Sequence, residues 1–140
     1  MLYGGGIMKK VTIAIVFALV FATIFLVSCG TTSTFKGVRR GVFENMAGYS
    51  INVTCDFADG TGTYTITTEE EHSKNIHCDV TAYSGYVKVT IQDDKGTEYL
   101  NKELNGKDSY VDDVELGDYG KYIITMVFDD YGGTYSFDWE

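Results

Sequence analysis

The sequence predicts an all-β protein, an antiparallel β-sandwich of about seven to eight short strands behind an N-terminal export signal. Apolar and polar residues alternate with period two in repeated runs from Tyr49 to the C-terminus, as in half-buried strands. Segments rich in glycine, asparagine and aspartate separate these runs, and the 140 residues include no proline. No stretch after the export signal has convincing helical periodicity.

The composition limits what the protein does. With 140 residues, 44% of them hydrophobic, the chain suits one folded domain and not a disordered protein. Its net charge of −9 at pH 7 has the wrong sign for sequence-independent binding to a phosphate backbone. We therefore expect no nucleic-acid partner.

The N-terminal segment has the pattern of a signal peptide. Lys9 and Lys10 precede an uncharged, mostly apolar run over residues 11–27. Three glycines stand before Met8, which we predict to be the true start of translation. Residues 1–28 are accordingly interpreted as the signal peptide, and an uncleaved membrane anchor is the alternative.

The end of this run resembles the lipobox of bacterial lipoproteins, on the residues Leu26-Val27-Ser28-Cys29-Gly30. The resemblance implies that the thiol of Cys29 carries a diacylglycerol lipid and that a peptidase cuts just before it. It also implies a membrane partner reached through the lipid, and a location at the cell membrane facing the extracytoplasmic side. We expect no cofactor beyond this covalent lipid.

Residues 29–48 are predicted to be the lipidated cysteine and a flexible tether, because Gly30-Thr31-Thr32-Ser33-Thr34 is small and polar. Residues 49–140 are predicted to form the sandwich. Its strands, in chain order, are expected at 50–57, 64–66, 76–82, 87–91, 97–103, 110–115, 122–128 and 134–139.

Turn signals lie between the expected strands. They are the segments 58–62, 84–85, 93–96, 105–106 and 129–133. Glycine and asparagine tolerate the positive φ of tight hairpins, and aspartate bonds to its own turn backbone. The strands are therefore expected to be antiparallel neighbours.

The segment Asp118-Tyr119-Gly120-Lys121-Tyr122-Ile123-Ile124 resembles the tyrosine-corner stretch of immunoglobulin-type sandwiches. The resemblance implies a structural tyrosine corner formed by Asp118, Gly120 and Tyr122. Ile124 stands where that family has a cysteine, so its inter-sheet disulfide is absent. Residues 86–140 are also similar to small lipoproteins of Gram-positive bacteria that end in an immunoglobulin-like domain, a group with no shared activity to carry over.

Cys55 and Cys78 both fall on the apolar phase of their strands. In an exported protein they are either a disulfide or two buried thiols, and the sequence leaves both alternatives open.

The sequence does not predict an enzyme or a metal site. It has no Gly-x-Ser-x-Gly elbow and no Ser-x-x-Lys motif, and its paired carboxylates are interpreted as turns and solvated faces. His72 and His77 lack further zinc ligands at suitable spacing. Aspartates gather at turns, but not in the spacing of an EF-hand loop, so we do not expect calcium.

Tyr83, Tyr86 and Tyr131 are predicted to be exposed and to form a binding surface. The sequence thus indicates a lipid-anchored, non-enzymatic envelope protein whose sandwich binds a protein or another envelope component. One alternative is a glycan-binding module that uses these tyrosines. Another is a small hydrolase inhibitor that inserts a loop into an active site.

Overall fold

The computed structural model describes residues 26–28, 31–69 and 74–140, and these form an antiparallel β-sheet. Its seven strands are β1 (Leu26–Ser28), β2 (Thr31–Ala47), β3 (Ser50–Thr68), β4 (Asn75–Asp93), β5 (Glu98–Asn105), β6 (Asp108–Glu115) and β7 (Gly120–Asp138). The all-β, antiparallel prediction is confirmed. The signal peptide predicted over residues 1–28 lies mostly outside the described residues, as does Cys29.

The strands follow the order β1-β2-β3-β7-β4-β5, and β6 pairs with β4 as well. The first half of β4, up to Ala82, pairs with β6, whereas its second half, from Tyr86, pairs with β5. β5 and β6 therefore follow one another along the same edge of β4. Because β5 and β6 have 8 residues each, it takes both to pair along the 19 residues of β4.

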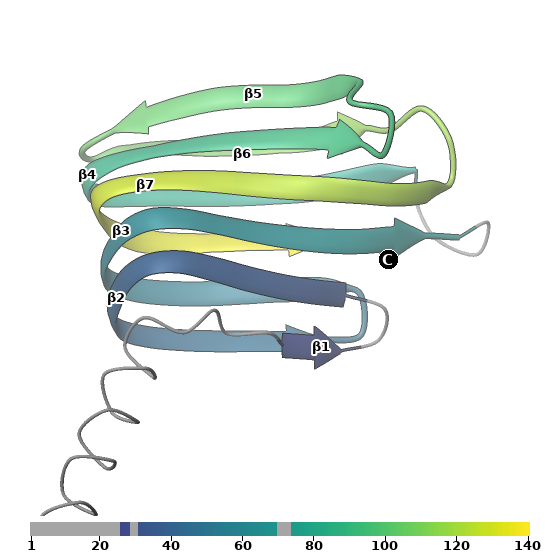
Figure 1. The fold of residues 1–140 in the computed structure, drawn as a ribbon. Coiled ribbons are helices and arrows are strands. Elements are labelled where there is room, and N and C mark those ends of the chain that lie inside the picture. Colours follow the sequence, from purple (N-terminus) through teal and green to yellow (C-terminus); the bar gives the residue numbers. More distant parts are fainter. Residues whose placement is uncertain (1–25, 29–30, 70–73) are drawn as a thin grey trace, which may run out of the picture.

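The sheet bends back on itself to make two layers, and the long strands turn over on the left of Figure 1. Layer A consists of β1, β5 and residues 31–37, 61–68, 86–93 and 120–128. Layer B consists of β6 and residues 42–47, 50–55, 75–82 and 133–138. We call the opposite end, where residues 116–119 pass from layer B to layer A, the open end.

Glycine and bulges produce the bends. The register shifts between Cys55 and Gly60, and again between Ala82 and Tyr86. At the second of these, Gly85 has a φ of +71°, and a Cβ there would lie 2.1 Å from the Asp130 carbonyl oxygen. Bulges bend a strand and increase its twist, so the long strands pass from one layer to the other without leaving the sheet.

The prediction of turns between separate strands is therefore wrong for three segments. Residues 58–62, 84–85 and 129–133 lie inside β3, β4 and β7. Six of the expected short strands merge into these three long ones. Residues 105–106 also lie at the bend, where the Gly106 N–H donates to the Gly85 carbonyl at 2.8 Å. Only 93–96 forms the expected turn, with the Asp93 N–H donating to the Thr97 carbonyl at 3.0 Å.

Two further predictions differ from the structure. An immunoglobulin-type sandwich has two separate sheets joined by Greek-key connections, whereas this chain forms one bent sheet. The segment predicted as a flexible tether is instead strand β2. Its alternate residues Thr31, Ser33 and Phe35 are buried, whereas the residues of a flexible tether would be exposed to solvent.

Apolar side chains on the inner faces of both layers form the core. Each long strand alternates buried and more exposed residues on either side of its bend. A polar contact crosses this core, because the Tyr64 hydroxyl in layer A lies 2.7 Å from the Tyr135 hydroxyl in layer B. Tyr64 also donates to Glu44 Oε1 at 3.1 Å, and Glu44 lies 3.5 Å from Arg39. Burial raises the pKa of both tyrosines.

Candidate functional site

The outer face of layer B carries a row of four small hydroxyl side chains across β3, β7, β4 and β6, continued on β2 by a phenylalanine. Inward-facing Val53, Val80 and Ala82 are buried, so their neighbours in the sequence point outward. The strand register places the outward residues side by side in the order Phe43, Thr54, Thr134, Thr81 and Ser109. Cross-strand threonine pairs of this kind stabilise the sheet.

A second row runs parallel to the first, two residues further along each strand. It consists of Asn45, Asn52, Ser136, Asp79 and Val111. Amide, hydroxyl and carboxylate groups therefore follow one another across β3, β7 and β4. Both hydrogen-bond donors and acceptors are available on this face.

The two rows are hollowed. One hollow of about 300 Å³ is lined by residues that include Phe43, Asn52 and Asp79. A neighbouring hollow of about 410 Å³ is lined by residues that include Thr81 and Tyr83. The hollows adjoin, because Thr134 of the first pairs with Thr81 of the second. We call this surface the trough; it consists of Phe43, Asn52, Thr54, Asp79, Thr81, Tyr83, Ser109, Thr134 and Ser136.

Two aromatic rings stand at the ends of the trough. Phe43 on β2 is 72% exposed and Tyr83 on β4 is 61% exposed. β3 and β7 separate these strands, so the rings are roughly 14 Å apart across three strand spacings of about 4.7 Å. The polar side chains of the two rows lie between these rings, so the trough combines aromatic and hydrogen-bonding groups on one face.

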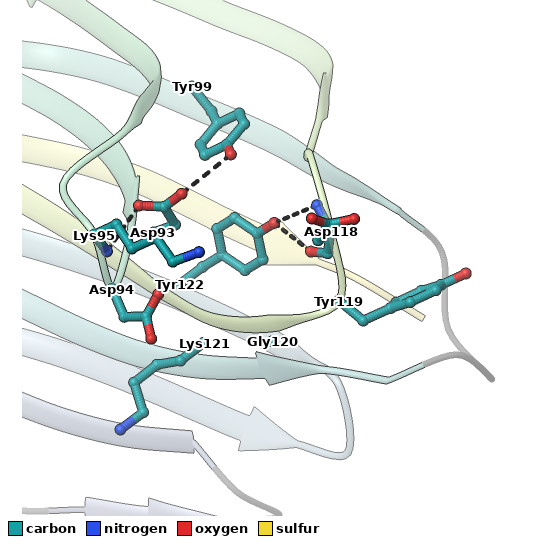
Figure 2. A pocket seen from close by; sticks show the side chains of 9 residues that line it. All are labelled: Asp93, Asp94, Lys95, Tyr99, Asp118, Tyr119, Gly120, Lys121 and Tyr122. Carbon is teal, nitrogen blue, oxygen red and sulfur yellow. Dashed lines mark hydrogen bonds between the residues drawn. The ribbon is translucent and has the colours of Figure 1, made fainter.

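A different pocket, of about 270 Å³, lies at the open end (Figure 2). The turn after β4 and the segment before β7 line it, with the residues Asp93, Asp94, Lys95, Tyr99, Asp118, Tyr119, Gly120, Lys121 and Tyr122. Two of its tyrosines, Tyr99 and Tyr122, pack edge to face with their ring centroids 5.6 Å apart. Tyr119 points away from them (Figure 2).

The polar groups of this pocket mostly bond to one another. The Tyr99 hydroxyl donates to Asp93 Oδ2 at 3.2 Å, and the backbone N–H groups of Lys95 and Thr97 donate to Asp93 Oδ1 at 2.9 Å. Desolvation raises the pKa of Asp93, but these hydrogen bonds outweigh it and hold that pKa below its usual range. The pocket therefore braces the turn after β4 and offers fewer free groups than the trough.

The predicted tyrosine-corner residues meet at the edge of this pocket. The Tyr122 hydroxyl donates to the Asp118 carbonyl and accepts from the Asp118 N–H at 3.2 Å. Gly120 N–H donates to the Thr68 hydroxyl at 3.2 Å. Tyr122 thus ties the segment that precedes β7 to its own strand.

The three tyrosines predicted to form a binding surface do not lie together. Tyr83 is exposed in the trough, and Tyr86 is half-buried with its hydroxyl donating to Glu103 Oε1 at 2.9 Å. Tyr131 is fully buried, so its predicted exposure is wrong. Asp130, with a φ of +47°, bends β7 so that the Tyr131 hydroxyl turns inward and donates to the Thr81 carbonyl at 2.7 Å.

The structure decides between the two alternatives for the cysteines. Cys55 and Cys78 are both free and buried. β7 lies between their strands, where Cys55 pairs with Gly133 and Cys78 with Phe137. Their Cα atoms are consequently two strand spacings and four residues apart, beyond the roughly 7 Å that a disulfide spans.

The bend gathers some of the turn aspartates. Carboxylate oxygens of Asp59, Asp129 and Asp130 lie within 4.8 Å of one another, and all three residues are exposed. Calcium takes about six to eight oxygen ligands, more than these three carboxylates readily provide. His77 Nδ1 lies 2.6 Å from Asp113 Oδ1, and His72 lies outside the described residues. Among the described residues, no helix has the length and apolarity to cross a membrane.

The comparisons with known proteins assign no family. No protein-family model matches the chain, and no curated protein sequence matches it. Solved structures align with low similarity. A variant of a family 29 carbohydrate-binding module has 10% identity and a TM-score of 0.38 over 85% of each chain. The cumin domain of Drosophila melanogaster CENP-C has 9% identity and a TM-score of 0.33, covering 84% of this chain and 72% of its own.

Sequence reasoning missed most of the trough. Phe43 fell in the predicted tether, and Asn52, Thr54 and Asp79 were placed only on the polar phase of their strands. The period-two pattern does predict that these side chains lie on the outer face of the sheet. Their alignment into rows depends on the strand order, which alternation does not specify.

Proposed function

We propose that this chain is a lipid-anchored, non-enzymatic protein of the cell envelope that binds a glycan in the trough. One observation carries the proposal. Two exposed rings, Phe43 and Tyr83, flank a row of threonine hydroxyls on one face of the sheet. This is the glycan-binding alternative, with Phe43 in the place of the buried Tyr131.

The chemistry of the trough suits a sugar. The C–H face of a pyranose ring packs on an aromatic side chain, and its hydroxyls exchange hydrogen bonds with amides, hydroxyls and carboxylates. Asn52, Thr54 and Ser136 supply these groups between the rings. A surface that crosses the strands over about 14 Å fits a chain of several sugars better than a single one.

The proposed anchor leaves the trough accessible. β2 begins with Thr31 at the open end, and only Gly30 separates it from Cys29. A lipid on Cys29 would hold the open end close to the membrane. The trough lies toward the bend, and its row with Phe43 and Thr54 is four residues, roughly 13 Å, from the open end of layer B.

The geometry favours the sheet face over loop insertion as the mode of binding. The described connections 48–49, 94–97, 106–107 and 116–119 are short. Among the described residues, none forms the long loop that a hydrolase inhibitor would insert into an active site.

The proposal is tested with the detergent-solubilised full chain on immobilised polysaccharides of neutral, anionic and amino-bearing types. We expect binding to at least one type, and a loss of about tenfold in affinity for Phe43→Ala and for Tyr83→Ala. Val127→Ala is the matched control, because Val127 is 40% exposed on layer A. Failure to bind any polysaccharide, or equal affinity in all variants, would contradict the proposal.

The anchor is tested separately. The wild-type chain should incorporate a radiolabelled fatty acid and remain with the membrane fraction, whereas Cys29→Ala should do neither. Retention and processing of Cys29→Ala like the parent would show that the lipid does not hold the protein. That result would leave the glycan test unaffected.

A further inference from the structure

The acidic residues of the chain are distributed unequally between the two layers. Layer B contains seven acidic residues and no lysine or arginine: Glu44, Asp79, Asp108, Asp112, Asp113, Glu115 and Asp138. Layer A contains three acidic residues, Asp93, Glu98 and Glu103, and four lysines, Lys36, Lys88, Lys102 and Lys121. The layer that carries the trough is therefore the more negative one, although Lys107, in the connection before β6, also lines the hollow beside Tyr83.

Asp79 brings this charge into the trough. Its neighbours in the register are Ser136 on β7 and Val111 on β6, neither of which is charged, and His77 lies two residues earlier on the same face of β4 and feels the Asp79 charge. The described residues include no hydrogen bond or ion pair to the Asp79 carboxylate. Other carboxylates of the molecule are engaged, such as Asp113 with His77 at 2.6 Å and Glu44 with Arg39 at 3.5 Å.

From this asymmetry we infer that the trough selects glycans that carry free amino groups. The inference rests on the proposed function and names its ligand class. A protonated 2-amino sugar brings an ammonium group to the Asp79 carboxylate, while its ring packs on Phe43 or Tyr83. An anionic glycan meets the like charge of Asp79 in the hollow beside Phe43, and an N-acetylated sugar lacks the cation.

Geometry and charge act together in this selection. The electrostatic field of layer B raises the local concentration of any cation, but it does not order a ligand. The rings and the hydroxyl row provide the order, because they run in one direction across β2, β3, β7 and β4. Asp79 lies on β4, the strand that carries Tyr83, beside Ser136 of β7, so it reaches an amino group near the Tyr83 end of such a chain.

The test compares two ligands of the same backbone, a β-1,4-linked glucosamine hexamer and its N-acetylated counterpart. Titration calorimetry uses the detergent-solubilised full chain, at a pH where the amines are protonated and aspartate is ionised. We expect the glucosamine hexamer to bind at least about tenfold tighter, as a charged hydrogen bond provides. Higher salt should reduce this difference.

Variants separate the contributions. Asp79→Asn should lower affinity for the glucosamine hexamer about tenfold and leave the N-acetylated hexamer unchanged. Asp94→Asn is the matched control, because Asp94 is exposed at the open end and outside the trough. Phe43→Ala should weaken both ligands.

The other possible results would overturn either the amine preference or the proposed function, and they can be told apart. Equal or tighter binding of the N-acetylated hexamer, still weakened by Phe43→Ala, would overturn the amine preference and leave the proposed function standing. A lysine hexamer that binds as tightly as the glucosamine hexamer, unaffected by Phe43→Ala, would show general attraction of cations and overturn the selection. If no polysaccharide of any type binds, the proposed function itself fails.

Discussion

At the scale of single residues, the interior contact between Glu44, Tyr64 and Tyr135 joins the two layers. Tyr64 and Tyr135 are buried, and Tyr64 bonds to both partners. Buried polar groups stabilise a fold only while they remain paired. The Glu44 side chain faces inward, and its sequence neighbour Phe43 is consequently turned to the solvent.

Tyr64→Phe should destabilise the protein by about 1–3 kcal/mol, because the Tyr135 hydroxyl and Glu44 each lose a partner away from water. Chemical denaturation measures the change. Tyr86→Phe is the control, since it removes an exposed contact with Glu103 and should cost less than about 0.5 kcal/mol. Equal losses in the two variants would contradict the role given to the interior contact.

His77 should titrate above the ordinary histidine value. The hydrogen bond that protonated His77 Nδ1 donates to Asp113 Oδ1 raises the pKa of His77, with further contributions from the charges of Asp79 and Asp138. Because the folded pKa is raised, the resulting stability is present below the unfolded pKa and is lost as pH rises through the folded one. NMR titration of the imidazole tests this, and Asp113→Asn should lower the value. An unchanged pKa in that variant would contradict the pairing.

The thiols of Cys55 and Cys78 should be unreactive in the native protein. Burial raises the pKa of Cys78 to about 12 and also raises the pKa of Cys55, so neither forms the nucleophilic thiolate near neutral pH. In a Cys29→Ser chain, a thiol reagent should label neither cysteine before denaturation and both afterwards. A non-reduced denatured chain without free thiols would instead indicate a disulfide.

At the scale of elements, the bends determine the architecture. Gly85 is where β4 passes between layers against the backbone of β7, and its missing side chain allows that approach. The same residue types that make hairpin turns also make bulges. Whether glycine and aspartate end a strand or bend it depends on pairing with a partner strand that lies far away in the sequence.

Gly85→Ala should destabilise the protein more than Gly96→Ala. Both glycines have positive φ, so alanine at either position costs about 1–2 kcal/mol in backbone strain. Only at Gly85 does the added Cβ also clash with backbone, whereas Gly96 has no atom within 4 Å. Thermal or chemical denaturation compares the two. A smaller loss for Gly85→Ala would contradict the close approach of β4 and β7.

The contrast between prediction and structure is clearest at this scale. Alternation predicted the inward phase correctly at Ile51, Val53, Val80 and Ile124, because burial of one face is a local property. It failed at Tyr131, where the bend reverses the side chain. For β2 the alternation was not predicted at all, and there Phe43 faces outward while Glu44 faces inward, where its carboxylate accepts a hydrogen bond from Tyr64.

At the scale of the whole molecule, the two layers have different surfaces. Both carry threonine rows: Thr54, Thr134 and Thr81 on layer B, and Thr34, Thr63, Thr125 and Thr90 on layer A. Only layer B combines its row with two exposed rings and an excess of carboxylates. Neither feature was predicted from the sequence, because both depend on which halves of the long strands share a layer.

Amide NMR of the detergent-solubilised protein during titration with the glucosamine hexamer tests the central claim most directly. The threonine rows on the two layers serve as matched probes. We expect concentration-dependent shifts at Thr54, Thr81 and Thr134, and none at Thr63, Thr90 and Thr125. Shifts confined to the layer A row, or to the open-end pocket around Tyr99 and Tyr122, would contradict the placement of the ligand in the trough.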